Sequence, residues 1–243
     1  MQIKALLFDF GDTLVHTEKF DYDQCLRKLH ESLTKDNISM PYEQFKSVYF
    51  ETRDKLYMEA KDSLREPKFT QRITQTLKHF GYQFKQQDVI ITRSAEAFAD
   101  AFTQMMQMEP YVPKLLNQLK TENKYKIGLV SNFALPPAVK KTLERFNIAK
   151  YFDTLTISGE AGWRKPNPKI FKKALQTLNT KSLETVFIGD SPHDDIEGAK
   201  NLGMKAILIK KVSINEDEEL GNPDKQISEL KELPKALSEL QDC

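Results

Sequence analysis

The chain has 243 residues, which is enough for one large domain or for a core domain with a smaller companion. Its 36 Lys and Arg residues balance 35 Asp and Glu residues, so the net charge gives no reason to expect binding to nucleic acid or to an anionic membrane. Its apolar runs are too short to span a bilayer, and the first one ends at Asp9, too soon for a secretory signal. Its two cysteines, Cys25 and Cys243, cannot form a disulfide framework. We therefore expect a cytoplasmic protein, and the sequence leaves its oligomeric state open.

The first predicted strand, residues 3–8, is followed by a long stretch with helical periodicity. Apolar positions recur there at helical spacing in four stripes: Leu26, Leu29 and Leu33; Phe45, Val48, Thr52 and Leu56; Ile73, Leu77 and Phe80; Ala95, Phe98, Phe102 and Met105. This pattern predicts that residues 16–110 are helical and that the stripes pack into a core shared by the helices.

From residue 111 onward, short apolar runs alternate with helical stretches. We expect strands at residues 127–130, 154–157, 186–188 and 206–209, with helices at 114–120, 138–146, 169–178 and 196–201. An acidic segment at 215–222 precedes a last strand near 226–227 and a helix from Ser228. Strands that alternate with helices imply crossover connections and a parallel sheet. The expected fold class is α/β, with a Rossmann-like sheet core (residues 1–15 and 111–243) and an inserted all-helical cap (residues 16–110).

Polar side chains follow three of the predicted strands at the point where each strand ends. The strands lead into Asp9–Thr13, into Ser131 and Asn132, and into Asp190–Asp195. In an open parallel sheet, ligands bind at the carboxyl ends of the strands, so these groups are expected on one edge. Lys165 precedes a helix with Asn167 at its expected cap and Pro168 in its first turn, which places the ammonium near the same edge.

Carboxylates beside a lysine and a hydroxyl suggest a hard cation and a phosphoryl group. Mg²⁺ takes oxygen ligands, commonly one or two carboxylates together with substrate phosphate. One carboxylate could then attack phosphorus and form an aspartyl-phosphate. Lys165 would keep that nucleophile ionised and bind a phosphoryl oxygen, and Ser131 would donate a hydrogen bond to another.

These segments resemble the four motifs of the haloacid dehalogenase-like hydrolase superfamily. The matching segments are IKALLFDFGDTL (3–14), IGLVSN (127–132), GWRKPNPKIF (162–171) and VFIGDSPHDDIEGAKNLGM (186–204). They occur in the family's order, each at an expected strand end, and the helical stretch resembles the family's cap of the first type. One short motif would be weak evidence, whereas four in order are specific.

The resemblance implies a Mg²⁺-dependent hydrolase of a small phosphate monoester, acting on a phosphorylated metabolite through an aspartyl-phosphate. It implies that Asp9 is the nucleophile, that Lys165 is catalytic and that Ser131, Asn132 and Lys165 bind the phosphate. It assigns the metal site to Asp9, the Gly11 carbonyl, Asp190 and Asp195. Of these, Asp195 acts from behind the direct ligands or positions Lys165, while neighbouring Asp194 has no settled role.

One position departs from the pattern of the family's phosphatases. They carry a second Asp two residues after the nucleophile, which protonates the leaving alcohol and later activates water. Here that position is Gly11, and Asp12 is one residue too far along to inherit the role. General acid–base help typically contributes roughly 100- to 10,000-fold in rate. His16, His193 or an acid from the cap could substitute, and the sequence does not choose among them.

Three other functions stay open at this stage. The chain could be a degenerate member that binds a phosphorylated metabolite or a protein partner. It could be a haloacid dehalogenase, although the pair Asp190 and Asp195 argues against that branch. It could cleave phosphonates through a cap lysine, for which Lys19, Lys28, Lys46 and Lys55 are the candidates. The aromatic residues Phe20, Tyr49 and Phe102 are expected in the core rather than at the substrate, and Trp163 is expected to pack.

Overall fold

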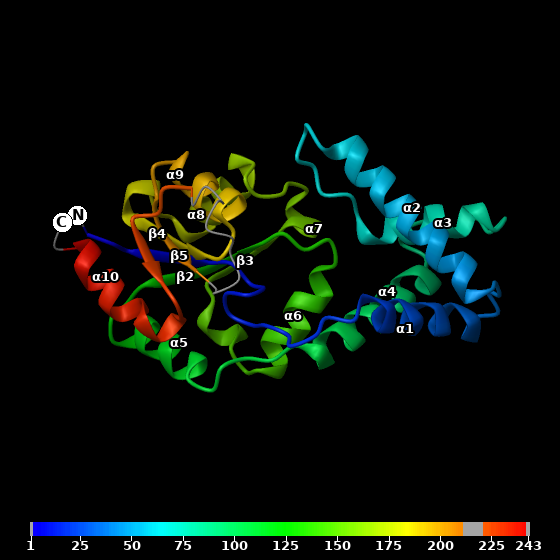
Figure 1. Ribbon diagram of the computed structural model, residues 1–243, viewed down its shortest axis with the longest axis horizontal. Coiled ribbons are helices and arrows are strands. Elements are labelled where there is room, and N and C mark those ends of the chain that lie inside the picture. The colour runs from blue at the N-terminus through cyan, green and yellow to red at the C-terminus, as the bar shows by residue number, and fades with distance from the viewer. Residues whose placement is uncertain (1, 211–220, 242–243) are drawn as a thin grey trace.

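The computed structural model describes residues 2–210 and 221–241. Within those residues, six parallel strands form one sheet with the spatial order β3-β2-β1-β4-β5-β6 (Figure 1). The strands are β1 Ala5–Phe8, β2 Lys126–Ser131, β3 Thr154–Ile157, β4 Thr185–Gly189, β5 Lys205–Ile209 and β6 Lys225–Ile227. The chain builds outward from β1 on one side and then returns to build on the other, so the topological switch lies between β1 and β4. This topology confirms the predicted α/β, Rossmann-like fold class.

The sheet is buried on both faces, as expected for parallel strands covered by helices. Side chains alternate along β1: Ala5 and Leu7 join one apolar cluster, whereas Leu6 and Phe8 join the other. The register aligns Phe8 with Leu129 of β2 on one side and with Ile188 of β4 on the other. The carboxyl ends of β1, β2 and β4 therefore meet at the same edge of the sheet.

The helices that accompany the sheet follow the predicted alternation. They are α5 Val112–Thr121, α6 Pro136–Arg145, α7 Ser158–Ala161, α8 Pro168–Leu178, α9 Gly198–Lys200 and α10 Leu233–Gln241. The predicted start of the helix at 196–201 is wrong, because a π-helical segment already occupies Pro192–Glu197. This segment starts early because the Ser191 hydroxyl oxygen accepts the Asp194 N–H. The last helix also begins later than Ser228, after a 3₁₀ turn at Leu230–Glu232. Residues 215–220 of the predicted acidic segment lie outside the described residues.

Four helices come between β1 and α5 and are called here the helical insertion. They are α1 Tyr22–Lys35, α2 Tyr42–Ala60, α3 Phe69–His79 and α4 Val89–Met105, and Figure 1 shows them at the opposite end of the molecule from the chain termini. The predicted stripe of α1 is fully buried. In α2, Tyr49 is buried in place of Val48 and Thr52, which are half-buried. The reason is tertiary, because the Tyr49 hydroxyl finds polar partners on other helices of the insertion.

Several sets of contacts connect the helical insertion to the sheet core, and one is the packing of α4 on α6, where Lys141 Nζ lies 2.6 Å from Asp100 Oδ1. Where the chain enters and leaves the insertion, His16 and Gln107 form a two-bond antiparallel bridge, with N···O distances of 2.9 and 2.7 Å. On the opposite side, the α2–α3 connection binds the loop before α8, where the Arg164 N–H donates to the Leu64 carbonyl at 2.9 Å. None of the helices in the described part of the chain combines the length and apolar character needed to cross a membrane.

Candidate active site

The carboxyl ends of three neighbouring strands place polar side chains around one cavity. Asp9 follows β1, and its N–H extends the ladder by donating to the Ile188 carbonyl at 2.9 Å. Ser131 is the last residue of β2, and Asp190 follows β4. All three line the same cavity together with Lys165. The structure thus brings together side chains that the sequence separates by more than a hundred residues.

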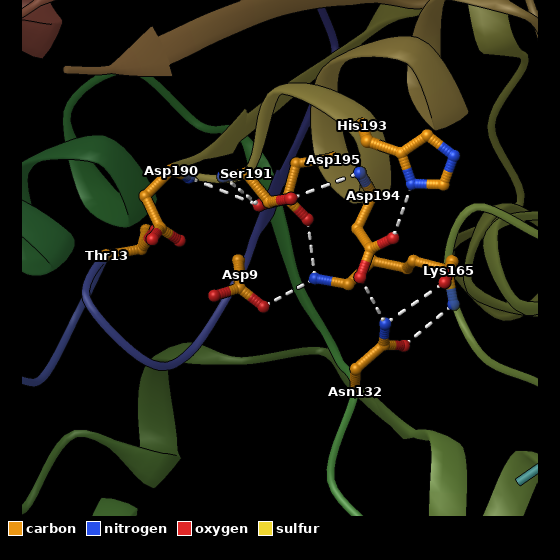
Figure 2. Close-up of polar contacts among 9 residues, drawn as sticks. All are labelled: Asp9, Thr13, Asn132, Lys165, Asp190, Ser191, His193, Asp194 and Asp195. Carbon is orange, nitrogen blue, oxygen red and sulfur yellow. Dashed lines mark hydrogen bonds and ion pairs between the residues drawn. The ribbon is translucent and has the colours of Figure 1, made fainter. Parts of the chain in front are cut away.

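Lys165 lies at the centre of this group (Figure 2). Its Nζ donates to Asp9 Oδ1 at 2.5 Å and forms an ion pair with Asp195 Oδ1 at 2.6 Å. The lysine is only 3% exposed, so solvent screens these charges weakly. The ammonium therefore fixes the orientation of the Asp9 carboxylate.

Asp195 is held from behind by the backbone of the β4 loop. Its Oδ2 accepts hydrogen bonds from the N–H groups of Asp190 at 3.1 Å and Ser191 at 3.0 Å. This approach needs a glycine at the end of β4, because a Cβ on Gly189 would lie 2.3 Å from Asp195 Oδ2. With Oδ1 paired to Lys165, both oxygens of Asp195 are engaged. The geometry assigns Asp195 to positioning Lys165, one of the two roles that the family resemblance allowed.

Asn132 fixes the backbone that carries Lys165. Its Oδ1 accepts the Lys165 N–H at 2.7 Å, and its Nδ2 donates to the Lys165 carbonyl at 3.1 Å and to Asp194 Oδ2 at 3.0 Å. Asn132 also lines the cavity beside Ser131 and Lys165, and its predicted contact with phosphate stays a prediction. The same hydrogen bonds give Asp194 a structural role that the sequence did not settle. The other oxygen of Asp194 pairs with the exposed ring of His193 at 2.9 Å (Figure 2).

Three carboxylates lie close enough to share a cation. Asp9, Asp190 and Asp195 each offer an oxygen, and these atoms lie within 4.8 Å of one another. Thr13 Oγ1 donates to Asp190 Oδ1 at 3.4 Å, which orients that carboxylate. Hard oxygen donors suit Mg²⁺. Because both oxygens of Asp195 are engaged, the residues that fit direct coordination are Asp9 and Asp190, with Gly11 on the same cavity wall.

The electrostatics of the cluster agree with such a site. Burial raises the pKa of Asp9 to about 7; the Lys165 ammonium opposes this shift, and the carboxylates of Asp195 and Asp190 add to it. The pKa of Asp190 is raised to about 6, chiefly by burial and also by the charges of Asp195 and Asp12. Burial acts to lower the pKa of Lys165, but Asp195 and Asp9 hold it above its ordinary value. Three carboxylates facing one ammonium leave an excess of negative charge, which a divalent cation would neutralise.

The position that lacks the second Asp is open. Among the described residues, an ideal Cβ at Gly11 meets no atom within 4 Å apart from its own chain neighbours, and Gly11 lines the cavity. Asp12 also lines the cavity, from a left-handed backbone conformation with φ of 57°. Of the two histidines considered from the sequence, His16 lines the cavity, whereas the His193 side chain is 68% exposed and does not.

The cavity measures about 490 Å³ and continues from the carboxylates into the helical insertion. That size is typical of a small-molecule site. Its insertion side is largely aromatic, and Phe133 of the β2–α6 loop packs on Phe102 with ring centroids 4.7 Å apart. The expectation that Phe20 is a core residue is wrong, because it is 44% exposed and lines the cavity. Phe102 is buried yet also lines the cavity, and Tyr49 is a core residue as expected.

Sequence reasoning missed several cavity residues, among them Tyr22, Tyr57 and Phe133, and the charged one is Arg72 of α3. The signal was available, since Arg72 shares the buried face of that helix with Phe69, Ile73 and Thr76. An arginine within an apolar stripe is unusual, because charged side chains are rarely fully buried without a partner.

Comparison with known proteins agrees with the fold and the motif order. The profile of the haloacid dehalogenase-like hydrolases matches residues 3–203. A glyceraldehyde 3-phosphate phosphatase of Pyrococcus furiosus is 30% identical over 214 residues, which are 86% of this chain and 81% of that protein. A haloacid dehalogenase-like phosphatase of Thermococcus onnurineus superposes with a TM-score of 0.64 at 27% identity, covering 97% of this chain and 98% of that one.

The 2-haloacid dehalogenase of Pseudomonas syringae pv. Tomato superposes with a TM-score of 0.72 at 24% identity, covering 98% of this chain and all of that one. At this identity the likeness concerns the fold alone. The profile match covers most of the chain, and it includes the segments that carry Asp9, Ser131, Lys165 and Asp190. The chain therefore belongs to the haloacid dehalogenase-like hydrolase family.

Proposed function

We propose that the protein is a phosphatase that hydrolyses a small phosphate monoester. The observation that carries this proposal is the buried Lys165 ammonium, which contacts Asp9 beside a cluster of oxygen donors on the wall of a cavity. This arrangement joins a carboxylate nucleophile to a cation that can bind a phosphoryl oxygen. The phosphatases among its relatives support the same activity.

In the proposed reaction, a carboxylate oxygen of Asp9 attacks phosphorus as the bond to the leaving oxygen breaks, giving an aspartyl-phosphate and an alkoxide that takes up a proton. Water then attacks phosphorus, releases phosphate and regenerates the Asp9 carboxylate. Ser131 and Lys165 hold phosphoryl oxygens, and Asp195 holds Lys165 in place. Mg²⁺, bound by Asp9, Asp190 and the Gly11 carbonyl, would neutralise negative charge on the phosphoryl group. The helical insertion acts as the cap that excludes water from the cavity.

The phosphonate alternative loses support from the cavity lining. Among the described residues that line the cavity, Lys165 is the only lysine, so none of the four candidates in the helical insertion reaches it. Two of those candidates have other partners: Lys46 pairs with Asp23 at 2.5 Å, and Lys28 pairs with Glu31 at 2.8 Å. An amine that forms a Schiff base must reach the substrate, and these do not line the cavity.

Phosphate release from p-nitrophenyl phosphate, with Mg²⁺ and with EDTA, tests the proposal. We expect turnover that depends on Mg²⁺ and is lost in Asp9→Asn, while Asp100→Asn, an exposed change on α4, retains it. Acid quenching during turnover of a radiolabelled substrate should leave phosphate on Asp9. Full activity in Asp9→Asn would contradict the proposal. Absence of turnover with intact Mg²⁺ binding would favour the binding protein, and turnover of 2-chloropropionate in EDTA would favour the dehalogenase.

A further inference from the structure

The cavity that begins at Asp9 also contains a buried cation, Arg72, in the helical insertion. Arg72 is 3% exposed, and its guanidinium donates three hydrogen bonds, all to tyrosine hydroxyls. Nη1 donates to Tyr22 at 3.2 Å and to Tyr49 at 3.3 Å, while Nη2 donates to Tyr57 at 3.3 Å. Within the described residues, no carboxylate accepts a hydrogen bond from this guanidinium. The charge is therefore buried among neutral groups.

One donor of Arg72 has no partner at all in the described part of the chain. The N–H of the buried Nε finds no acceptor among the described residues. Nε and Nη2 share one edge of the planar guanidinium, and that edge matches the two oxygens of a carboxylate or phosphate. An orphaned N–H on a buried cation costs free energy unless a ligand supplies the acceptor. The unpartnered N–H of Arg72 therefore suits an oxyanion as its hydrogen-bond acceptor.

The nearest carboxylate in this hydrogen-bond network does not neutralise Arg72. Glu66 lies one step away, where its Oε1 accepts from the Tyr57 hydroxyl at 2.7 Å. Its Oε2 accepts from Ser158 at 2.6 Å and lies 3.9 Å from Arg164 Nε. Glu66 thus has a cation of its own, and the pair of arginines keeps an excess positive charge on this side of the cavity.

Between the two charged ends, the cavity wall is apolar and aromatic. Phe20, Phe98, Phe102 and Phe133 line it, and the polar groups gather at the Asp9 end and around Arg72. A ligand complementary to this lining would have an anion at each end and a flat or apolar middle. Since the phosphoryl group occupies the Asp9 end under the proposed function, the second anion belongs to the leaving group.

We infer that Arg72 is a specificity-determining residue that binds a distal oxyanion, a carboxylate or a second phosphate, on the leaving group of the phosphate monoester. The inference rests on the proposed function for the placement of the reacting phosphate. It names a substrate class that is narrower than phosphate monoesters in general.

Aryl phosphates that differ in the ring substituent opposite the phosphate test this assignment. The probes are 4-carboxyphenyl phosphate, its neutral carboxamide analogue and 1,4-phenylene bisphosphate, together with the meta isomers to vary the span. In the wild-type protein we expect kcat/KM for the carboxylate or the bisphosphate to exceed that for the carboxamide by roughly 10- to 100-fold, the range of a charge-assisted hydrogen bond. The charged probe with the higher kcat/KM identifies whether a carboxylate or a phosphate is bound. Equal rates for charged and neutral probes would overturn the inference.

Variants locate the effect. Arg72→Met should reduce the ratio of charged to neutral probe toward one, Arg72→Lys should give an intermediate ratio, and Arg53→Met, in the same insertion but outside the cavity, should keep the wild-type ratio. Circular dichroism checks that each variant is folded. If Arg72→Met does not fold, comparing the ratio of Arg72→Lys with that of the wild type still tests the inference. A wild-type ratio that persists in Arg72→Met would overturn the inference.

A binding measurement separates this inference from the proposed function. Isothermal titration with 4-carboxybenzyl phosphonate and its carboxamide analogue needs no turnover. If no aryl phosphate is hydrolysed, the phosphatase proposal fails, but tighter binding of the carboxylate that depends on Arg72 would still support the distal site. If hydrolysis proceeds and neither binding nor kcat/KM depends on the far-end charge, the distal site fails alone.

Discussion

Ser158 donates a hydrogen bond of 2.6 Å to Glu66, and this bond joins the first residue of α7 in the sheet core to the α2–α3 connection of the helical insertion. Both residues are buried. The neighbouring backbone adds the bond from the Glu66 N–H to the Gly162 carbonyl at 3.2 Å. Ser158 begins α7 and Gly162 follows it, just before the segment that leads to Lys165, so the position of the insertion is linked to the loop that carries the Lys165 ammonium.

Loosening this contact should weaken closure of the insertion over the substrate. Ser158→Ala removes a buried hydrogen bond to a charged group, which typically costs about 1.5–3 kcal/mol. If the insertion must close for substrate to bind, we expect KM to rise roughly tenfold or more, since 1.4 kcal/mol corresponds to a factor of about ten. Steady-state kinetics with p-nitrophenyl phosphate measure the change.

The matched control is Ser63→Ala in the same connection, where the hydroxyl is exposed and donates to the Ala60 carbonyl. Its KM should stay near the wild-type value. A double-mutant cycle with Glu66→Gln should be non-additive, because both changes remove the same interaction. Additive effects, or a Ser158→Ala variant with unchanged KM, would show that this bond does not govern closure.

The close approach of Asp195 to Gly189 gives a second prediction. A methyl group there would lie 2.3 Å from Asp195 Oδ2, and Asp195 is 1% exposed and cannot withdraw into solvent. Gly189→Ala should therefore displace Asp195 from its two backbone N–H donors and release Lys165. We expect kcat to fall by roughly 100-fold, as for loss of an electrostatic group in an active site.

The control for Gly189→Ala is Gly11→Ala, since a Cβ at Gly11 meets no atom within 4 Å. Thermal unfolding should show a clear loss of stability in Gly189→Ala and little change in Gly11→Ala. Wild-type kcat in a folded Gly189→Ala protein would mean that Asp195 does not position Lys165.

The alternation of short apolar runs with helical stripes was sufficient to predict the fold class and nearly every strand. Element ends depended on local contacts that periodicity does not contain. Ser191 caps the segment after β4 and starts it at Pro192, four residues earlier than the apolar pattern indicates. Likewise, Tyr49 replaced Val48 on the buried face of α2 because its hydroxyl has partners from distant parts of the insertion.

The candidate site was predictable at the strand ends and unpredictable in the helical insertion. The sheet fixes where Asp9, Ser131 and Asp190 end up, so their motifs locate them. Phe20 reaches the cavity through the tertiary arrangement of the insertion and has no local signature, whereas Arg72 is marked only by its place in an apolar stripe, which does not tell what it contacts. The hydrogen bonds from the Asn132 amide to the Lys165 backbone also depend on tertiary contact and could not be predicted from the motif.

Magnesium binding should compete with protons. The pKa values of Asp9, raised to about 7, and Asp190, raised to about 6, lie above the unfolded value of 3.8. From about pH 4 to about pH 7 the metal-free folded state binds more protons than the unfolded chain, so its stability falls as pH rises through this window. Mg²⁺ requires the ionised carboxylates and relieves their repulsion at high pH.

We therefore expect Mg²⁺ to raise Tm strongly near pH 8 and weakly near pH 5.5, with affinity changing roughly 100-fold between them, because each pKa unit corresponds to a factor of ten. Differential scanning fluorimetry and isothermal titration measure both quantities. Asp190→Asn should lose the Mg²⁺ shift and should be more stable than the wild type without metal near pH 8. Equal Mg²⁺ shifts at the two pH values would place the ion elsewhere.

The open space beside Gly11 predicts that a substitution there can increase the phosphatase activity. In the described part of the chain an ideal Cβ there meets no atom within 4 Å and the residue lines the cavity, so Gly11→Asp adds a carboxyl group at the cavity wall without a clash at its Cβ. The new carboxyl group would supply the proton that the leaving alcohol needs. We expect kcat/KM for alkyl phosphates to rise by roughly 100-fold or more, the usual range for general acid–base catalysis. Phosphates with good leaving groups, such as p-nitrophenyl phosphate, should change far less.

Gly11→Asn is the matched control, since it has the same size but cannot donate and accept a proton as a carboxyl group does. If Gly11→Asp and Gly11→Asn give equal rates on alkyl phosphates, the Asp side chain is not reaching the leaving oxygen. A large gain in Gly11→Asp alone would mean that proton transfer limits the native protein and that neither Asp12 nor His16 fully provides it. The leaving-group dependence of kcat/KM separates these outcomes, because a native protein with its own proton donor would hydrolyse alkyl and aryl phosphates at similar rates.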